Sequence, residues 1–386
     1  MPGDGLTITG GTVLAPARSV AADVVIAGDR VVSVAGAPLP GLGATLDAAG
    51  LVVAPGLIDL QCNGAGGIDL ATEPERLWEI AVLLPRWGVT AWLPTIVSGP
   101  AEVRRRALGA LRAGPPDGIA RGRYAVPLGL HLEGPFLAPP HRGAHRREHL
   151  ADPDPAVVAG EDWSAAAGVA LVTLAPELPG AVDVVRDLVE RGVVVSAGHS
   201  GATAGEATAA ADAGVTYVTH LFNAMRPWHH REPGLAGVAL TDPRLTVGVI
   251  ADGVHLHPTT VAVAAAALGS RLSLVTDAVA ALGTAVDPAD AAGFRLDDGT
   301  LAGSTLPLDR AVRNVVAWAG VPVASAVAAA TATPAGVLGL ADRGTIMPGA
   351  VGDLVLLDRA GEVVATVIGG RVAFDRRGML PHPRYR

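Results

Sequence analysis

Eight runs of β-type apolar residues, most of them separated by helical patterns, constrain the fold of this chain more than any other feature. The runs cover residues 56–60, 90–95, 124–132, 170–175, 193–198, 217–221, 245–251 and 271–276. The helical patterns cover residues 75–87, 101–113, 181–191, 204–213, 258–268 and 308–319. Buried parallel strands read as near-continuous apolar runs, and eight of them alternating with helices predict a closed (β/α)8 barrel rather than an open doubly wound sheet. Residues 223–244 show no clear helical pattern, so we expect that crossover to be mostly loop.

Both ends of the chain fall outside this alternation. Short strand-like segments with Gly turns occupy the first 50 residues (LTITGGTVL, DVVIAGDRVVSVAG, ATLDAAGLVV) and the C-terminal part (GTIMPGAVGDLVLLD, EVVATVIGGRVAFD). Such patterns are typical of β-hairpins. We therefore predict one small β-sandwich built from residues 1–54 and 344–386, with the barrel of residues 55–343 inserted between its two parts.

Composition excludes several classes of protein. Half of the 386 residues are hydrophobic and 17% are charged, so a large core is feasible. No apolar stretch reaches the roughly 18 uninterrupted residues of a membrane-spanning helix, and the N-terminus lacks the pattern of a secretory signal, so we expect no membrane association. The single cysteine, Cys62, is compatible with a reducing cytoplasm, where we expect the protein to act. The net charge of −8 argues against a nucleic-acid partner.

The sequence contains no lysine at all. This absence excludes Schiff-base catalysis and a phosphate-binding loop of the lysine type. It also excludes a carboxylated lysine that bridges two metal ions.

Polar side chains follow four of the predicted strands. Glu133 follows the third run, His199 the fifth and His220 the sixth. Because the carboxyl ends of barrel strands meet at one end of the barrel, we expect these three side chains to lie together, as in a hydrolytic zinc site that keeps one position open for water. Asp277 follows the eighth run, where a carboxylate can take the proton of that water and later protonate the leaving group. One such residue alone is more often a loop or capping residue, but the four together predict a metal-dependent hydrolase.

Seven segments carry a family resemblance that covers essentially the whole chain in order. They are PGLIDL at Pro55, HLEGPF at His131, GHS at Gly198, THLFNAM at Thr219, REPGLAG at Arg231, ADGVH at Ala251 and TDA at Thr276. Together they resemble the N-acetylglucosamine-6-phosphate deacetylases of the amidohydrolase superfamily. HLEGPF, HLFNAM and REPGLAG are specific to this branch, whereas PGLIDL and the GTIMPGAVGDLVLLD tail are shared across the superfamily. The resemblance implies hydrolysis of the acetamide of N-acetylglucosamine 6-phosphate, giving glucosamine 6-phosphate and acetate, in amino-sugar catabolism or recycling.

The resemblance also implies roles for individual residues. Glu133, His199 and His220 match the metal ligands, and Asp277 matches the catalytic acid/base. His145, in a long loop over residues 134–163, looks like the residue that helps the metal to polarise the acetyl carbonyl. The positions that resemble substrate contacts are Ala144, Asn223, Ala224, Arg231, His255, Leu301, Ala302 and Gly303. A phosphate needs charge-assisted donors, and the planar fork of Arg231 suits its oxygens.

One departure from the superfamily pattern bears on the number of metal ions. Many members carry His-x-His directly after the first strand, whereas this chain has Gln61, Cys62 and Asn63 there. Neutral amides are poor ligands for a divalent transition metal. We therefore expect one divalent ion per subunit, with Gln61 and Asn63 free to bind substrate. Zn²⁺ suits two imidazoles and a carboxylate, and Fe²⁺ and Co²⁺ also fit.

Partners and alternative functions follow from the same comparison. The family resemblance implies a homodimer whose interface lies near the phosphate site. Deacetylation of N-acetylgalactosamine 6-phosphate stays open, because the orientation of one hydroxyl group leaves no trace in the sequence. Another amidohydrolase-type amidase is disfavoured by the missing lysine and His-x-His. A non-catalytic barrel that binds a sugar phosphate is disfavoured by the presence of all three ligands together with Asp277.

Overall fold

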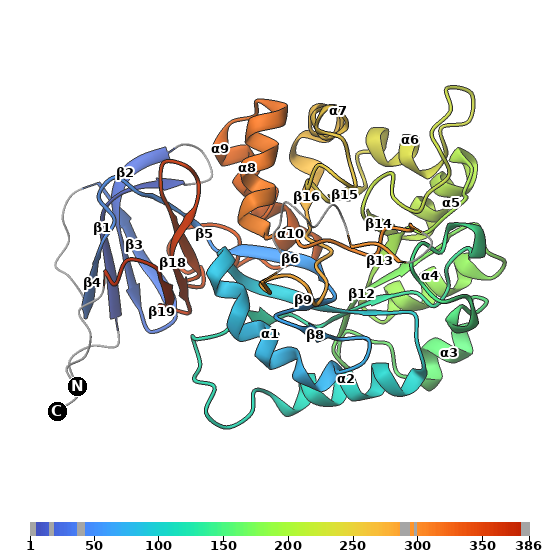
Figure 1. Cartoon of the computed structure of the whole chain (residues 1–386), viewed down its shortest axis with the longest axis horizontal. Coiled ribbons are helices and arrows are strands. Elements are labelled where there is room, and N and C mark those ends of the chain that lie inside the picture. The colour runs from blue at the N-terminus through green and yellow to red at the C-terminus, as the bar shows by residue number, and fades with distance from the viewer. Residues whose placement is uncertain (1–4, 15–18, 37–42, 286–293, 297–298, 380–386) are drawn as a thin grey trace.

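In the computed structural model, which describes residues 5–14, 19–36, 43–285, 294–296 and 299–379, a barrel of parallel strands lies beside a smaller β unit (Figure 1). The barrel strands within these residues are β6 (Leu57–Cys62), β9 (Val89–Val97), β11 (Leu130–Glu133), β12 (Val169–Leu174), β13 (Val194–Ala197), β14 (Val215–Val218), β15 (Thr246–Val249) and β16 (Leu272–Leu274). Each pairs in parallel with the next one in this order. The predicted eight-stranded parallel barrel is confirmed.

The third predicted strand, over residues 124–132, is interrupted. The structure has a short β10 (Val126–Pro127) that pairs with β9, and then β11. Between them Gly129 adopts a φ of 125°, and a Cβ there would lie 2.7 Å from the Cβ of Ala170 on the neighbouring strand. The close approach of the two backbones explains both the break and the glycine.

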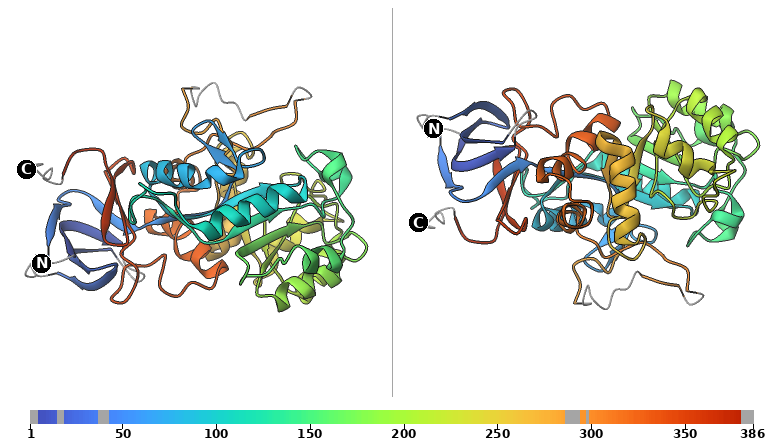
Figure 2. Two further views of the ribbon diagram at one scale, coloured as in Figure 1. Left: turned by 90° about the horizontal axis from the view of Figure 1, so that it is seen from below. Right: turned by 90° about the horizontal axis from the view of Figure 1, so that it is seen from above.

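Helices surround the barrel strands (Figure 2). The described helices are α1 (Leu77–Leu83), α2 (Ala101–Ala113), α3 (Pro155–Gly160), α4 (Ala181–Glu190), α5 (Ala204–Ala213), α6 (Gly234–Thr241), α7 (Pro258–Leu268), α8 (Leu308–Ala319), α9 (Val323–Ala328) and α10 (Ala332–Val337). Five of the six predicted helices, at α2, α4, α5, α7 and α8, are confirmed. The sixth, predicted over residues 75–87, is divided into α1 and two 3-10 turns on either side of it, at Pro74–Arg76 and Leu84–Trp87. Pro85, which has no N–H to continue the α-helical hydrogen bonds, explains the second of these turns. No helix in these described parts is long and apolar enough to cross a membrane.

The crossover at residues 223–244 contains a helix that the sequence pattern did not reveal. We expected mostly loop, and that expectation was wrong for the second half, where α6 forms. Every residue from Gly234 to Leu240 is buried, so the helix has no polar face to produce a 3.6-residue period. The first half of the crossover, up to Pro233, is non-helical as expected.

The smaller unit joins the two ends of the chain. Its strands are β1 (Gly5–Leu14), β2 (Ser19–Ala27), β3 (Arg30–Ala35), β4 (Ala44–Asp47), β5 (Val52–Pro55), β17 (Leu354–Leu357), β18 (Val363–Ile368) and β19 (Arg371–Asp375). Antiparallel pairing of β17 with β5 connects the two segments, and the unit has its own apolar core. The two ends therefore form one β unit as predicted, but its strands belong to a single hydrogen-bonded sheet.

A bend in β1 lets this single sheet enclose its core. The first half of β1 pairs with β4 and the second half with β5, and the register shifts between Ile8 and Gly11. Gly10, at the bend, has a φ of 72°, which glycine adopts without strain. The domain boundaries at residues 54 and 344 stay a prediction.

The first and last barrel strands meet through two sets of backbone hydrogen bonds. At the carboxyl end, Asp277 N–H donates to Gln61 O (2.9 Å) and Asn63 N–H donates to Ala278 O (2.7 Å). At the opposite end, the turn at residues 329–330 accepts one bond from β16 and one from β6. These contacts define a seam between β6 and β16 that completes the barrel.

A buried carboxylate lies inside the seam. Asp59 on β6 accepts hydrogen bonds from the hydroxyl of Thr276 (2.6 Å), from the Thr276 N–H (3.2 Å) and from the Gln61 N–H (3.2 Å). Burial raises the pKa of Asp59 to about 7 despite these bonds. Three hydrogen bonds from both sides of the seam thus offset part of the cost of a buried carboxylate.

Asp59→Ala should lower the free energy of unfolding by about 3 kcal/mol, because it leaves buried donors on both strands without an acceptor. Asp59→Asn should lower the free energy of unfolding by less, since the amide keeps one oxygen that accepts hydrogen bonds. Denaturant unfolding followed by circular dichroism measures both. Asp183→Ala, which removes an exposed carboxylate on α4, is the matched control and should leave the curve unchanged. Equal midpoints for Asp59→Ala and the control would contradict this account of the seam.

Candidate active site

Three of the predicted site residues leave their strands in a strained backbone conformation. His199 follows β13, His220 follows β14 and Asp277 follows β16, with φ values of 49°, 26° and 48°. All three side chains are buried. Left-handed backbone at non-glycine residues is uncommon and gathers at functional sites. Its occurrence at the same end of three barrel strands indicates a site at this end.

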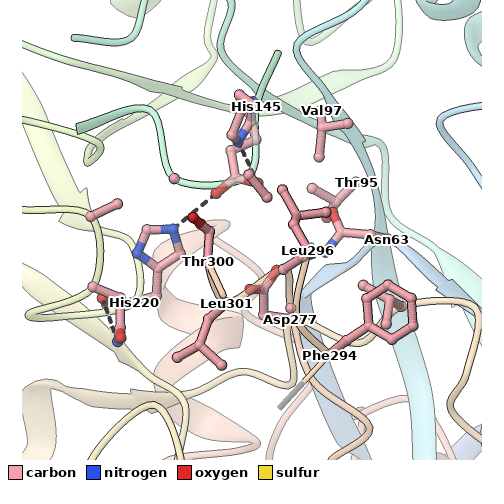
Figure 3. A pocket seen from close by; sticks show the side chains of 18 of the residues that line it. Asn63, Thr95, Val97, His145, His220, Asp277, Phe294, Leu296, Thr300 and Leu301 are labelled. Carbon is pink, nitrogen blue, oxygen red and sulfur yellow. Dashed lines mark hydrogen bonds and ion pairs between the residues drawn. The ribbon is translucent and has the colours of Figure 1, made fainter. Parts of the chain in front are cut away.

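Glu133, His199 and His220 converge on one point. Oε1 of Glu133 lies 3.1 Å from Nε2 of His199 and 3.0 Å from Nε2 of His220, and the two nitrogens lie 3.0 Å apart. The structure therefore brings together the carboxylate and both imidazoles that the strand-end pattern singled out. Figure 3 shows His220 at this point, with His145 and Asp277 close by.

The ring of His199 presents a lone pair to this point. Its Nδ1 lies 3.0 Å from the carbonyl oxygen of His141, which can only accept, so the ring hydrogen is on Nδ1. Burial lowers the pKa of His199 to about 4, so the ring is neutral and Nε2 has no hydrogen. The lone pairs of Nε2 and of the Glu133 carboxylate oxygen then point toward each other and repel. Such a pair is stabilised by a cation between them.

The charges around this point also favour a cation there. Burial opposes ionisation of Glu133, but the surrounding imidazoles of His145, His199 and His220 lower the pKa of Glu133 well below its usual range. Burial acts against the charged form of His220, yet Glu133 raises the pKa of His220. One carboxylate oxygen and two imidazole nitrogens are the donors of hydrolytic zinc sites. The second ring nitrogen of such a ligand usually has a partner, which Nδ1 of His199 finds in the His141 carbonyl, whereas Nδ1 of His220 has none among the described residues. The described residues fit a divalent cation.

His145 is a second candidate for the third ligand, because ligand atoms of Glu133, His145 and His199 all lie within 4.8 Å of one another. However, Nδ1 of His145 accepts the backbone N–H of Ser98 (3.2 Å), so a neutral ring carries its hydrogen on Nε2. That nitrogen lies 3.7 Å from Oε2 of Glu133. An N–H in this position suits a hydrogen-bond donor, which favours His220 as the ligand.

Asp277 is tied to the rest of the site by two amides. Its Oδ1 accepts hydrogen bonds from Nδ2 of Asn63 (2.7 Å) and Nε2 of Gln61 (3.1 Å). Burial and the charge of Glu133 raise the pKa of Asp277 to about 6. A carboxyl group with its pKa near neutrality suits proton transfer in both directions.

The expectation that Gln61 is free to bind substrate needs correction. Its Nε2 donates to Glu133 (2.8 Å) as well as to Asp277, and its Oε1 accepts from the hydroxyl of Thr219 (2.6 Å). The whole amide is therefore used to hold the two carboxylates. Asn63 differs, because its Oδ1 has no hydrogen-bond partner among the described residues and Asn63 lines the pocket.

A cavity of about 580 Å³ opens over these residues. Most of the predicted substrate contacts line it, namely Asn63, Ala144, Asn223, Ala224, His255, Leu301, Ala302 and Gly303. Arg231 does not: it is exposed, and its Nη1 lies 2.8 Å from Nε2 of His230. The volume is in the usual range for small-molecule sites.

One wall of the pocket contains residues that the sequence pattern did not predict. Phe294, Arg295, Leu296 and Thr300 line it together with Leu301, and backbone hydrogen bonds join Leu296 to Thr300 and Ala302 to Phe294. Figure 3 shows Phe294, Leu296 and Leu301 around Asp277. The segment GFRLDDGTLAGS carries a hairpin signal, a DG pair between apolar-polar alternations, that could have revealed this wall.

Comparisons with known proteins agree with this geometry. Residues 52–373 match the amidohydrolase family. An N-acetylglucosamine-6-phosphate deacetylase from Bos taurus is 40% identical over 356 residues, covering 85% of each chain. An N-acetylgalactosamine-6-phosphate deacetylase from Escherichia coli is 35% identical, covering 83% of this chain and 88% of that one. The structure of a mutant N-acetyl-D-glucosamine-6-phosphate deacetylase from Mycobacterium smegmatis, in complex with N-acetyl-D-glucosamine-6-phosphate, matches with a TM-score of 0.85 and 33% identity, covering 96% of this chain and 100% of that one.

The geometry predicts that the protein takes up one divalent ion per chain and is stabilised by it. A ligand that binds only the folded state adds about 2.7 kcal/mol at a free concentration 100 times its Kd, so Zn²⁺ should raise the unfolding midpoint. Glu133→Gln and His199→Ala should abolish this rise, and His230→Ala, which alters an exposed imidazole, should keep it. Calorimetric titration and elemental analysis measure the stoichiometry. Two bound ions, or unchanged binding in Glu133→Gln, would contradict the prediction.

Proposed function

Because the chain belongs to the amidohydrolase family, within its N-acetylglucosamine-6-phosphate deacetylases, we propose that it hydrolyses the acetamide of N-acetyl-D-glucosamine 6-phosphate. The products are glucosamine 6-phosphate and acetate, and the reaction belongs to amino-sugar catabolism or recycling. The observation that carries the proposal is the convergence of Glu133, His199 and His220 on one point, with Asp277 beside it on the same pocket.

Glu133, His199 and His220 are the residues that would hold the proposed single divalent ion. Zn²⁺ suits this donor set best, and Fe²⁺ and Co²⁺ also fit. A bound ion of this kind polarises the acetamide carbonyl and lowers the pKa of water. Asn63 and Gln61 occupy the positions where a second pair of histidines would be needed, which supports one ion rather than two.

Asp277 is the proposed acid/base. Both amides hydrogen-bond to its Oδ1, which leaves Oδ2 for the attacking water. Asp277 takes the proton of this water as the C–O bond forms, and it gives the proton to the nitrogen of the departing amine as the C–N bond breaks. The raised pKa of Asp277 supports both steps, since the group can change protonation state near neutral pH.

His145 is the proposed donor to the acetyl oxygen. Ser98 N–H occupies its Nδ1, so the hydrogen on Nε2 is available to the oxygen as negative charge develops there. Arg142 helps to hold the loop, because its Nη1 donates to the carbonyl of His145 (2.8 Å). A donor that is already oriented needs little reorganisation during the reaction.

We propose Asn63, Ala144, Asn223, Ala224 and residues 301–303 as sugar contacts, and His255 and Arg231 as phosphate contacts. Arg231 lies outside the pocket of its own chain, so its proposed role is in the pocket of a second subunit. This supports a homodimer with its interface near the phosphate site. A cytoplasmic location is proposed from the single cysteine.

The epimeric substrate, N-acetylgalactosamine 6-phosphate, is a second candidate. It is favoured by one observation, the 35% identity to the Escherichia coli deacetylase named for that compound. The chemistry at the acetamide is the same for both epimers. The two candidates therefore differ only in the fit of the sugar ring.

Asp277→Asn should keep metal binding and lose turnover. Proton transfer by a positioned carboxyl group contributes about 10²- to 10⁴-fold, and an amide of the same shape cannot perform it. Acetate release under saturating substrate measures turnover, and elemental analysis measures the metal. Asp183→Asn, on the exposed face of α4, is the control. Turnover within a few-fold of the unaltered protein would rule out the role of Asp277.

A panel of three substrates tests the substrate class. We expect kcat/KM to be highest for N-acetylglucosamine 6-phosphate, lower for its galactosamine epimer, and about 10- to 100-fold lower for unphosphorylated N-acetylglucosamine, since charge-assisted hydrogen bonds to the phosphate are lost. Coupled assay of acetate measures all three. Equal kcat/KM with and without the phosphate would exclude the proposed roles of Arg231 and His255.

A further inference from the structure

The loop after β15 contains an acidic residue that has no part in the mechanism above. Asp252 follows the strand directly, three residues before His255. Its Oδ1 accepts the backbone N–H groups of Val254 and of His255, both at 2.8 Å. Its Oδ2 lies 2.7 Å from Nδ1 of His255. One carboxylate therefore holds both the backbone and the imidazole ring of His255.

Residues of α8 support this loop. Nδ2 of Asn314 donates to the carbonyl of Ala251 (2.7 Å), which secures the chain just before Asp252. Gly253 adopts a φ of 84°, and a Cβ there would lie 3.3 Å from the ring of Trp318. The backbone between Asp252 and His255 is thus held at several points. The orientation of the imidazole is a property of a rigid loop rather than of one side-chain rotamer.

The contact with Asp252 determines which ring nitrogen is left for a ligand. Since Nδ1 faces the carboxylate, Nε2 is the nitrogen that remains for the pocket, which His255 lines with Asn223 and Ala224. A neutral ring with its hydrogen on Nδ1 has a lone pair on Nε2, and this lone pair repels an anion. Only the protonated ring offers N–H groups on both sides.

The carboxylate of Asp252 lies against this ring in a nearly buried environment. Both side chains are nearly buried, with 4% of His255 and 10% of Asp252 exposed, so their charges are weakly screened. Burial opposes ionisation of Asp252, but the hydrogen bond from His255 and the backbone N–H groups lower the pKa of Asp252 below its ordinary value. An ionised carboxylate 2.7 Å from an imidazole stabilises the imidazolium.

We propose that Asp252 is a positioning residue that holds His255 with a carboxylate against Nδ1 and with Nε2 directed at the pocket, and that it thereby sets the preference for amino sugars that carry a phosphate. The inference rests on the proposed function, in which His255 contacts the phosphate. Asp252 itself touches no substrate. It acts only through the donor capacity of His255.

A purely structural role for Asp252 makes a different prediction. If the carboxylate only shapes the turn, its loss should affect phosphorylated and unphosphorylated substrates alike. Asp252→Asn separates the two roles, because the amide keeps the volume and an acceptor oxygen but loses the charge. Asp242→Asn is the matched control, since Asp242 caps a turn at the other end of β15 by accepting the N–H of Arg244.

The main experiment is a double-mutant cycle on the metal-loaded enzyme. For Asp252→Asn we expect KM for N-acetylglucosamine 6-phosphate to rise at least tenfold, with kcat and the kcat/KM for unphosphorylated N-acetylglucosamine unchanged. His255→Ala should raise this KM by at least as much, and the double variant should raise it no more than His255→Ala alone. Asp242→Asn should behave as the unaltered enzyme. Additive losses, or equal losses on both substrates, would overturn the inference.

Binding of inorganic phosphate, measured by calorimetry, separates failure of this inference from failure of the proposed function. Asp252→Asn should weaken the binding of inorganic phosphate by about tenfold. His255→Ala should weaken it too, because both variants remove the same contact. If the phosphate affinity is unchanged in Asp252→Asn, or if His255→Ala removes none of it, the inference is wrong. An enzyme that shows the expected phosphate binding but releases no acetate from either 6-phosphate would instead overturn the proposed function.

Discussion

The seam between the first and last barrel strands is the contact on which the rest of this structure depends. Asp59 on β6 holds Thr276, and further along the same seam the amides of Gln61 and Asn63 hold Asp277. The hydrogen bonds that complete the barrel therefore lie directly beside those that orient the Asp277 carboxylate. Gln61 also reaches Glu133, so two carboxylates that would repel each other share one donor.

Negative charge at this end of the barrel explains most features of the site. Glu133 keeps its charge because three imidazoles surround it, and its field together with burial raises the pKa of Asp277. One group is thus prepared to hold a cation and the other to exchange a proton, in the way that paired carboxyl groups with separated pKa values divide their tasks. Asp252 and His255 form a second such contact, in which a carboxylate holds an imidazole at the wall of the pocket.

The sequence predicted the barrel, the joining of the two chain ends and the cluster of Glu133, His199 and His220. These predictions succeed because buried parallel strands produce long apolar runs and because polar residues at strand ends stand out against them. The same reasoning failed at α6, where burial on all sides removes the helical period, and at the wall formed by Phe294 and Leu296. It also failed at Gln61, whose amide is occupied by contacts with residues far away in the chain.

What the sequence alone indicated is the kind of chemistry, because the polar residues at the strand ends and the absence of lysine favour the proposed metal site of two imidazoles and a carboxylate. The tertiary structure decided how those residues work. Only the contact of His199 with His141 shows which nitrogen faces the ligand point, and only the contact of His145 with Ser98 identifies a donor rather than a ligand. Arg231, predicted beside the phosphate, lies outside its own pocket. The position of a ring hydrogen, and the pocket that a side chain can enter, depend on neighbours that are distant in the sequence. No local sequence pattern reveals those neighbours.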